Sequence, residues 1–445
     1  MAIDISILTA ALQAKIDALD SNSAISDIVA LERAAQQFGT TTYYDSDGDL
    51  PEATYFPKQS IVSTYSPPTV NVASKLYINN FGTWKEIQTF KTQVAFQGSD
   101  AGYVGKAIVA PITTEFAKFS FVSETDTTIV GSVAPSMGVA EMESYLGGGS
   151  RGASSRENGY VIGGDPPSWL APPAPTGNRS NAVTQYSFAS EVISRAGSLT
   201  DDNADGFTDG YSISALDYQE VYFGGGIRGT PLPVPERDQP LVKFPTANPW
   251  VSATVSVVYY PAGSYPSPIT SERSPINGAI GIPSSTTGYV VGGRIGGPTT
   301  TVPQPIDFMS TNIKSFPFAS ATPLDNTRSL TTGKAFAAGV SSTTNGYVVG
   351  GYGPFPSGNP TREIIESFPF ANPAANSVDA GNLSILVFKS AGMSSTTKGY
   401  SAAGAGGTPT LAIQSFPYSS FTTATTVANL ITSNSGFTNT ASFQQ

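Results

Sequence analysis

The chain has 445 residues with a net charge of −10, only 13% charged residues, and neither cysteine nor histidine. Without these two residue types it can form no disulfide, no thiolate or imidazole metal site, no cysteine nucleophile and no Ser-His-Asp triad. The acidic balance without a basic block argues against a nucleic-acid partner, whereas 39% hydrophobic residues with 45 Gly and 34 Pro favour a packed, mainly β chain rich in turns.

Residues 1–39 predict a helical N-terminal segment. Apolar residues recur there at helical spacing, at Ile7, Leu8, Ala11, Leu12, Ile16 and Leu19. This stripe belongs either to a hairpin that folds back on the main body or to an anchor that packs on copies of itself or on another subunit. The start has no basic region and no long apolar core, and no later run spans about 18 apolar residues, so we expect neither a signal peptide nor membrane insertion.

Residues 40–88 predict a small β module. The runs SIVSTYS, KLYINN and FGTWKEI are rich in β-branched and aromatic residues. Within this module Asp45, Asp47, Asp49 and Glu52 crowd into DSDGDLPE. The glycine follows Asp47 directly instead of standing at the sixth place of an EF-type calcium loop, so a solvated turn is favoured over a metal site.

From about residue 89 the chain is repetitive. A first signature, SSTTNGYVVGG at 341–351, recurs as SSTTGYVVGG, SSTTKGYSAAG and SSRENGYVIGG, and a second, SFPFAS, follows each copy in varied form. The tyrosine of the first signature marks six units, at Tyr103, Tyr160, Tyr222, Tyr289, Tyr347 and Tyr400. Self-similarity at a period of roughly 50–60 residues indicates a repeat architecture.

Each unit divides into four short strands, which predicts a β-propeller over residues 89–445, with six blades favoured over seven. The first strand of each unit is made of small residues, as expected where strands converge on an axis. Phe316 and Phe318 share one face of a third strand and should fill the space between blades, and Pro317 should end or bulge that strand. The tail 431–445 is expected to close the ring as a partial strand. The alternative is another all-β stack, such as two sandwiches.

The loop between the outer strand of the second unit and the third unit predicts a calcium site. Its sequence DDNADGFTD fits the spacing D-x-N-x-D-G-x-x-D, at which successive oxygens converge on Ca²⁺. The expected ligands are Asp201, Asn203, Asp205, the carbonyl of Phe207, and Asp209. Because the twelfth place is Ser212 and not a bidentate Glu, affinity should be modest and the ion structural. A plain acidic turn is the alternative.

The chain has two Pro-rich insertions. Trp169 lies within the first, and Trp250 lies near the second. Such loops project from one face of a propeller, so these tryptophans are candidates for stacking on sugar rings. The alternative is that they cover blade edges.

The helical start, the module ending LYINNFGTWKEI and the units of form SSTT-GYVVGG … SFPFAS together resemble kelch-like β-propeller virion proteins of marine tailed phages, including those of cyanobacteria. The repeats carry this resemblance over about residues 89–430. It implies a structural protein made in the host cytoplasm and displayed on the tail or head surface of the particle. Residues 1–88 would bind other virion proteins, and the chain would form a homo-oligomer there.

The leading hypothesis is therefore a non-enzymatic virion protein whose propeller is an outward platform for decoration or host contact. One alternative is a carbohydrate-binding adhesin of tail-fibre type that contacts a host-surface glycan. Another is a glycan-cleaving propeller with carboxylates and a tyrosine nucleophile. Arg151 is the only arginine that we place in an inner strand, and copper oxidases of kelch type lack their histidine and cysteine ligands here, so no catalytic residue and no cofactor other than Ca²⁺ is expected.

Overall fold

The computed structural model describes only part of the chain. The described residues are 43–44, 61–64, 74–80, 83–90, 97–98, 100–105, 116–133, 150–164, 182–198, 207–208, 210–215, 219–225, 227–228, 241–246, 253–255, 276–295, 308–321, 328–353, 363–405, 410–420, 422–430 and 441–444. They contain strands and turns but no helix, and hence no helix that could cross a membrane. The helical segment predicted for residues 1–39 lies outside them.

The chain divides into two compact units, Met1–Gln93 and Val94–Gln445. The first contains one four-stranded sheet in the order β1-β2-β3-β4. Its strands are β1 (Tyr43–Tyr44), β2 (Ile61–Thr64), β3 (Ser74–Asn80) and β4 (Thr83–Phe90). The runs KLYINN and FGTWKEI form its longest antiparallel pair, β3 with β4, and β1 joins β2 in parallel.

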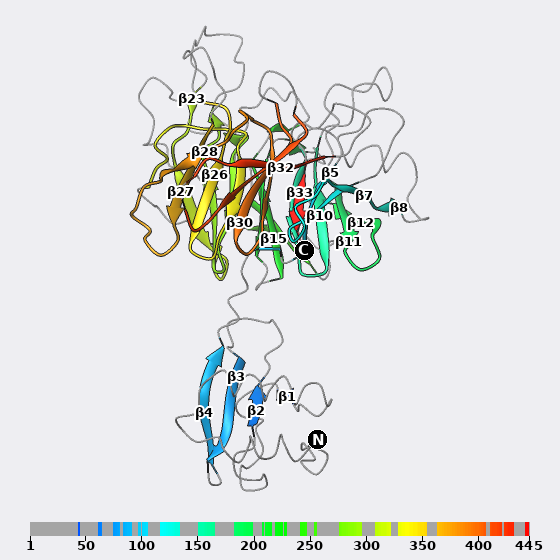
Figure 1. Cartoon of the computed structure of the whole chain (residues 1–445), viewed down its shortest axis with the longest axis vertical. Coiled ribbons are helices and arrows are strands. Elements are labelled where there is room, and N and C mark those ends of the chain that lie inside the picture. The colour runs from blue at the N-terminus through cyan, green and yellow to red at the C-terminus, as the bar shows by residue number, and fades with distance from the viewer. Residues whose placement is uncertain are drawn as a thin grey trace. The chain divides into compact units, whose positions relative to one another are not determined.

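The second unit is a six-bladed β-propeller, as the repeats predicted (Figure 1). Blade 1 is β33 (Ser442–Gln444), β5 (Ala101–Gly105), β6 (Phe116–Ser120) and β7 (Thr128–Val130). Blade 2 is β9 (Arg151–Ser154), β10 (Asn158–Ile162), β11 (Ala182–Ser187) and β12 (Val192–Ser198), and blade 3 is β14 (Tyr211–Ala215), β15 (Glu220–Gly224), β17 (Leu241–Pro245) and β18 (Ala253–Val255).

The remaining three blades carry the clearest repeats. Blade 4 is β20 (Ile280–Pro283), β21 (Thr287–Val291) and β24 (Ile313–Pro317). Blade 5 is β25 (Ala338–Ser341), β26 (Asn345–Val349), β27 (Ile364–Pro369) and β28 (Val378–Asn382), and blade 6 is β29 (Ala391–Ser394), β30 (Lys398–Ala402), β31 (Ala412–Pro417) and β32 (Thr425–Asn429). In each blade the strand named first is innermost.

The ring closes through the tail of the chain. In antiparallel register β33 pairs with β5, with Phe443 opposite Tyr103, and in Figure 1 it lies beside β5 and β10. The inner strands contact one another in the order β33, β9, β14, β20, β25, β29 and back to β33. The predicted closure by residues 431–445 is thus confirmed, and β33, a strand of three residues, makes it.

The tyrosines of the first signature hold neighbouring blades together. Tyr289 of blade 4 lies between two aromatic side chains of blade 5, with ring centroids 5.2 Å from both Phe368 and Phe370. The tyrosines at 103, 222, 347 and 400 likewise contact two aromatic residues of the next blade, and Tyr160 contacts Phe244. Such pairs add about 0.5–1.5 kcal/mol each beyond the burial of their surface.

This arrangement confirms two further predictions. Phe316 and Phe318 do fill the space between blades, against Tyr222 of blade 3. The third strands also end at their prolines: β24 stops at Pro317 and β31 at Pro417. Proline can occupy the last position because no further ladder bond needs its missing N–H.

The serine pair of the first signature has two separate tasks. The second serine closes the turn between the first two strands: the Oγ of Ser342 accepts the N–H of Asn345 at 2.9 Å. Ser284 and Ser395 do the same for Thr287 and Lys398. The first serine lies in the inner strand. The polar signature is therefore structural in both halves.

Elements beyond the predicted four strands extend some blades. Blade 2 gains a fifth strand, β8 (Ser132–Val133), which follows blade 1 in sequence and pairs in parallel with β12. Two small sheets also form: β13 (Phe207–Thr208) with β16 (Ile227–Arg228), and β19 (Ile276–Asn277) with β22 (Arg294–Ile295) and β23 (Phe308–Met309). Gly278, Gly292 and Gly293 have φ of +66°, +63° and +102°. These left-handed conformations let the chain bend between blade 4 and the sheet of β19, β22 and β23.

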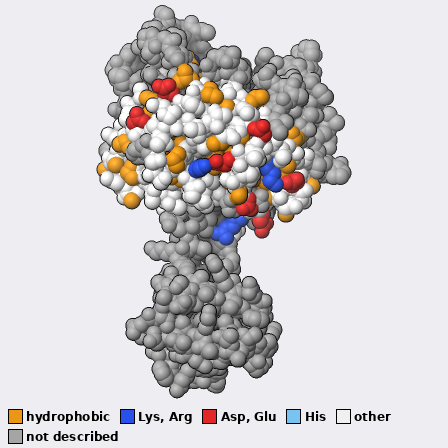
Figure 2. Space-filling view, viewed as in Figure 1, with side chains coloured by type: hydrophobic (Ala, Val, Ile, Leu, Met, Phe, Trp, Pro, Cys, Tyr) orange, Lys and Arg blue, Asp and Glu red, His pale blue; other side chains and the backbone are white. Residues whose placement is uncertain are grey.

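The described residues on one face of the propeller carry few charges. On the face shown in Figure 2 the charged side chains of described residues stand singly or beside a charge of opposite sign among uncharged atoms. Two ion pairs join adjacent blades, Lys118 with Glu191 at 3.1 Å and Lys398 with Glu124 at 2.8 Å. Their side chains are about a quarter to two fifths exposed, so each contributes little, on the order of 1 kcal/mol or less.

Candidate functional site

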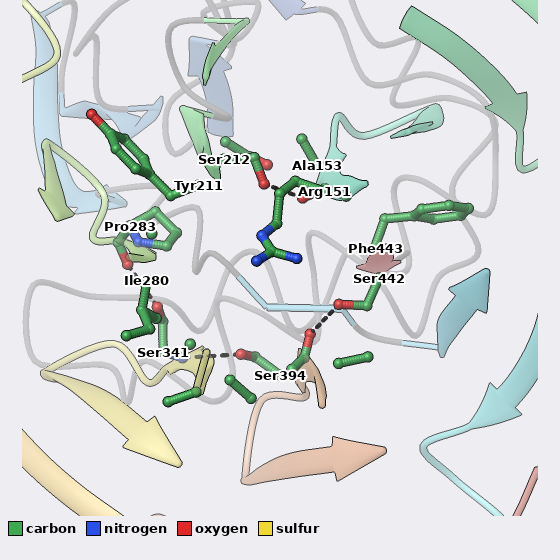
Figure 3. A pocket seen from close by; sticks show the side chains of 18 of the residues that line it. Arg151, Ala153, Tyr211, Ser212, Ile280, Pro283, Ser341, Ser394, Ser442 and Phe443 are labelled. Carbon is green, nitrogen blue, oxygen red and sulfur yellow. Dashed lines mark hydrogen bonds between the residues drawn. The ribbon is translucent and has the colours of Figure 1, made fainter. Parts of the chain in front are cut away.

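The six inner strands enclose a central channel with a cavity of about 100 Å³. Residues of all six blades line it, from β33, β9, β14, β20, β25 and β29 and the positions just before these strands. Equivalent positions of all six repeats therefore lie side by side along the channel. It is the candidate site in the described part of the chain (Figure 3).

Glycine sets the width of this channel. At one inner-strand position blades 2, 4, 5 and 6 carry Gly152, Gly281, Gly339 and Gly392. An added Cβ on Gly281 would lie 2.1 Å from the carbonyl oxygen of Ser212 in blade 3, and one on Gly392 would lie 2.4 Å from that of Gly339 in blade 5. The prediction of small inner-strand residues is confirmed, and the reason is backbone-to-backbone approach between blades.

A series of hydrogen bonds joins the C-terminal ends of neighbouring inner strands. The backbone N–H of Ser341 donates to Ser394 Oγ at 3.0 Å, and that of Ser394 donates to Gln444 Oε1 at 2.6 Å. The N–H of Gln444 donates to Ser154 Oγ, and that of Ser154 to Ser214 Oγ, at 2.9 and 2.8 Å. At these four junctions a blade therefore satisfies a buried group of its neighbour, which fixes their relative rotation.

Blade 4 departs from this pattern because Pro283 occupies the equivalent position. Proline has no N–H to donate to Ser341. The hydroxyl of Ser341 reverses its role and donates to the carbonyl of Pro283 at 2.8 Å. Blades 4 and 5 therefore stay hydrogen-bonded at this position, but the donor now belongs to blade 5 and the acceptor to blade 4.

Arg151, at the start of β9, points into the channel. Figure 3 shows its guanidinium directed toward the open middle, away from Ala153 and Phe443. Its Nε donates to the carbonyl of Gly210 in blade 3 at 2.6 Å, and its Nη1 donates to the carbonyl of Ser150 at 3.2 Å. These bonds orient the plane of the guanidinium.

Lys389 is a second cation of the lining and lies at the same end of the channel. It precedes β29 by two residues and has φ of +57°, as Phe336 of blade 5 has +55° and Gly278 of blade 4 has +66°. Two backbone bonds of 2.7 Å link these three residues, from Phe336 N to Gly278 O and from Lys389 N to Phe336 O. They hold two non-glycine residues in the left-handed region, and Lys389 Nζ lies 5.2 Å from the Phe336 ring centroid.

Two cations are among the described residues of the channel lining. The described lining residues include Arg151 and Lys389 but no carboxylate. Tyr211 also lines the channel, and burial raises the pKa of its phenol above the usual value, so that it stays neutral.

The other sequence-predicted site residues lie outside the described part. This holds for Asp201, Asn203, Asp205, Asp209, Trp169 and Trp250. Phe207 begins β13, whose backbone alone is described. Among the described residues no three His, Cys, Asp or Glu side chains gather to hold a metal ion. The calcium and stacking hypotheses therefore stay predictions.

Sequence reasoning noticed Arg151 in the inner strand but missed Lys389. The signal was present: FKSAGMSS aligns with FAAGVSS only when Lys389 is set against Phe336, just before a small-residue strand. No protein-family model and no curated protein matches this chain. The geometry of the channel and the repeats themselves carry the functional argument.

Proposed function

We propose that this chain is a non-enzymatic structural protein of a phage particle, with a kelch-like propeller that acts as an outward platform for decoration or host contact. In this proposal residues 1–88 attach it to other virion proteins, and several copies assemble on the tail or head surface. The resemblance of the repeats to virion propellers of marine tailed phages supports the assignment.

One observation carries the proposal: the recurring residues are occupied in building the ring. The tyrosines lie between aromatic residues of the next blade, and the serines close turns or join inner strands. A repeat whose conspicuous polar and aromatic residues all support packing is typical of a rigid platform. Binding would then reside in what differs between blades, meaning the connecting segments and single channel residues.

The kelch-like assignment rests on blade design. Paired glycines follow the second strand, at Gly292-Gly293 and Gly350-Gly351, with φ between +63° and +103°. Together with the three or four short antiparallel strands described in each blade and a period of roughly 50–60 residues, this supports the kelch-like assignment.

The non-enzymatic part of the proposal rests on composition. Glycoside hydrolysis needs a pair of carboxyl groups that face one another across the scissile bond. The described channel lining offers cations and hydroxyls instead. Incubation with a panel of polysaccharides should yield no reducing ends, and release by the purified full chain would contradict this part.

Cryo-electron microscopy of the intact particle that carries the chain tests the platform itself. We expect residues 1–88 against a portal, tail or capsid neighbour, and the propeller facing solvent. A propeller wedged between other subunits with its loops covered would make the chain a spacer. A glycan array then separates decoration from adhesion, because only an adhesin should bind particular saccharides.

Calcium in the 201–209 loop is the proposed cofactor. Calorimetry should detect binding at millimolar Ca²⁺, and chelation should lower the melting temperature. The alternative is a plain turn, for which neither measurement would change.

A further inference from the structure

We propose that the segment through which the chain enters the propeller, Gln97-Gly98, is a strap that locks the closed ring. It acts together with β33, so that each of the two segments holds the other in place on blade 6. The inference concerns how the ring opens, and it does not depend on the proposed function.

The strap crosses the junction at which the ring closes. It leads directly into β5 of blade 1, yet its hydrogen bonds reach blades 6 and 5. The N–H of Gly98 donates to the carbonyl of Ser394 at 2.8 Å, and Gly98 also forms a parallel bridge with Ser395. Gln97 Nε2 donates to the carbonyl of Ser341 at 3.2 Å. The start of β5 therefore cannot move away from blade 6 unless these bonds break.

One residue of blade 6 receives both ends of the propeller chain. The N–H of Ser394 donates to Gln444 Oε1 at 2.6 Å, and the carbonyl of Ser394 accepts the strap. Its hydroxyl accepts the N–H of Ser341 at 3.0 Å, as the dashed line between the two serines in Figure 3 shows. Release of either segment therefore frees the residue to which the other is bound. Such shared hydrogen bonds make the strap and β33 open cooperatively.

Comparison of the blades shows that this contact is an addition to the common design. Blade 6 carries Tyr418 at a position where four other blades carry phenylalanine, at Phe121, Phe188, Phe318 and Phe370. The hydroxyl of Tyr418 donates to the carbonyl of Ser341 at 2.9 Å, and the same oxygen accepts Gln97. A carbonyl oxygen has two lone pairs and can accept both bonds. Packing needs only the aromatic ring, so the hydroxyl serves the junction that the strap crosses.

The strap also lies on the path of any load that is applied to the first unit. That unit ends at Gln93, and the chain passes from there through Gln97-Gly98 into β5. A pull along the chain is therefore borne by the bonds to Ser341 and Ser394 before it reaches β5. The strap thus protects the pairing of β5 with β33 on which closure depends.

Hydrogen exchange of the full chain, followed by mass spectrometry on peptides of β5, β29 and β33, tests the inference. Exchange of these amides reports local opening of the ring. We expect Gln97→Ala to speed exchange in all three strands about threefold to tenfold, the range that corresponds to the loss of one net hydrogen bond. Exchange in blade 3, which lies away from this junction, should not change.

Two tyrosine variants give a matched comparison. Tyr418→Phe copies the residue of four other blades and should speed exchange in β29 and β33. Tyr160→Phe removes a hydroxyl that donates to the carbonyl of Thr246 between blades 2 and 3, at 3.0 Å. It should leave exchange in β29 and β33 within about twofold of the parent.

Unchanged exchange of β33 in Gln97→Ala would overturn the inference, because the strap would then be a local contact that does not hold the closing strand. Equal acceleration in the two tyrosine variants would also overturn it, since it would indicate general loosening of the ring. Deletion of Ser442–Gln444 supplies the reciprocal measurement. Coupling between two sites is mutual, so the deletion should speed exchange of the Gly98 amide, and an unchanged rate there would contradict the lock.

Discussion

The buried ion pair of Lys334 and Glu366 offers a sharp test of how the strands of one blade are held together. Both side chains are fully buried, with Nζ and Oε1 3.2 Å apart. Lys334 also donates to the carbonyl of Ile364 at 2.8 Å, and Glu366 Oε2 accepts the N–H of Thr331 at 2.7 Å. The pair fixes the segment that leads into β25 onto the third strand of its blade.

Blade 6 solves the same problem without charge. Gln414 stands where blade 5 has Glu366, and Val387 stands where it has Lys334. Gln414 Oε1 accepts the N–H of Ile385 at 2.8 Å and its amide donates to the carbonyl of that residue at 3.0 Å. The chain thus contains its own neutral replacement for the pair.

We expect Glu366→Gln alone to lower the free energy of unfolding by about 3–5 kcal/mol, because it removes the negative charge that lies 3.2 Å from a fully buried ammonium. Lys334→Val should cost somewhat less, since Thr331 and Ser377 still donate to the carboxylate. The double variant copies blade 6 and should lie within about 1–2 kcal/mol of the parent, the remainder reflecting the donor that Ile364 loses.

Urea unfolding of the four proteins, followed by circular dichroism, measures the coupling. Glu191→Gln is the matched control: it breaks the solvent-screened pair with Lys118, whose side chains are 41% and 34% exposed, and should cost about 1 kcal/mol or less. If the double variant lost as much stability as the two single variants together, the two residues would not be coupled and the reasoning would fail.

Three further predictions concern closure, the tyrosines and pH. Deleting Ser442–Gln444 removes the inner strand of blade 1 and should open the ring, which limited proteolysis would detect as new cleavage in β5 to β7, while an unchanged digest would count against closure by β33. Tyr347→Phe should change stability by less than about 1 kcal/mol because the Tyr347 hydroxyl is buried without a partner, whereas Tyr400→Phe should cost about 1.5–3 kcal/mol because its hydroxyl donates to Glu124 at 2.9 Å; equal melting of the two variants would argue against this hydrogen bond. Stability should fall as pH rises above about 10, because burial raises the pKa of several tyrosines in the folded state only, so the unfolded chain loses protons first, at about 1.4 kcal/mol per pH unit for each tyrosine. These are Tyr103, Tyr160, Tyr186, Tyr211, Tyr289, Tyr400 and Tyr418. Absorbance at 295 nm should then show their ionisation coinciding with unfolding, and ionisation without unfolding would refute the linkage.

The blade count, the closing strand and the packing of Phe316 were predictable because they depend on periodicity. A residue that recurs every 50–60 positions must occupy equivalent environments, so one blade explains the others. Pro317 could be placed at a strand end for the same local reason, its missing N–H.

What escaped prediction depends on differences between blades. Nothing in the sequence near Pro283 says that Ser341, 58 residues later, will reverse its hydrogen bond. Lys334 and Glu366 look like ordinary surface charges until the fold buries both. Lys389 gains meaning only when the ring brings its strand to the same channel as Arg151. The Pro283 and Lys389 contacts lie between units, and the ion pair is peculiar to one unit, so the pattern that the units share encodes none of them.

The position of β33 also governs the order in which the propeller can be completed during synthesis. Gln444 donates to Ser154, a residue made 290 positions earlier, so blade 1 waits for its inner strand until residues 442–444 have left the ribosome. At about 5–20 residues per second that delay is on the order of tens of seconds. During it, Tyr103 and Phe116 lack the Phe443 ring that covers them in the finished protein. The nascent chain therefore exposes an aromatic edge for longer than any other blade does, and this edge is where premature pairing between neighbouring chains would begin.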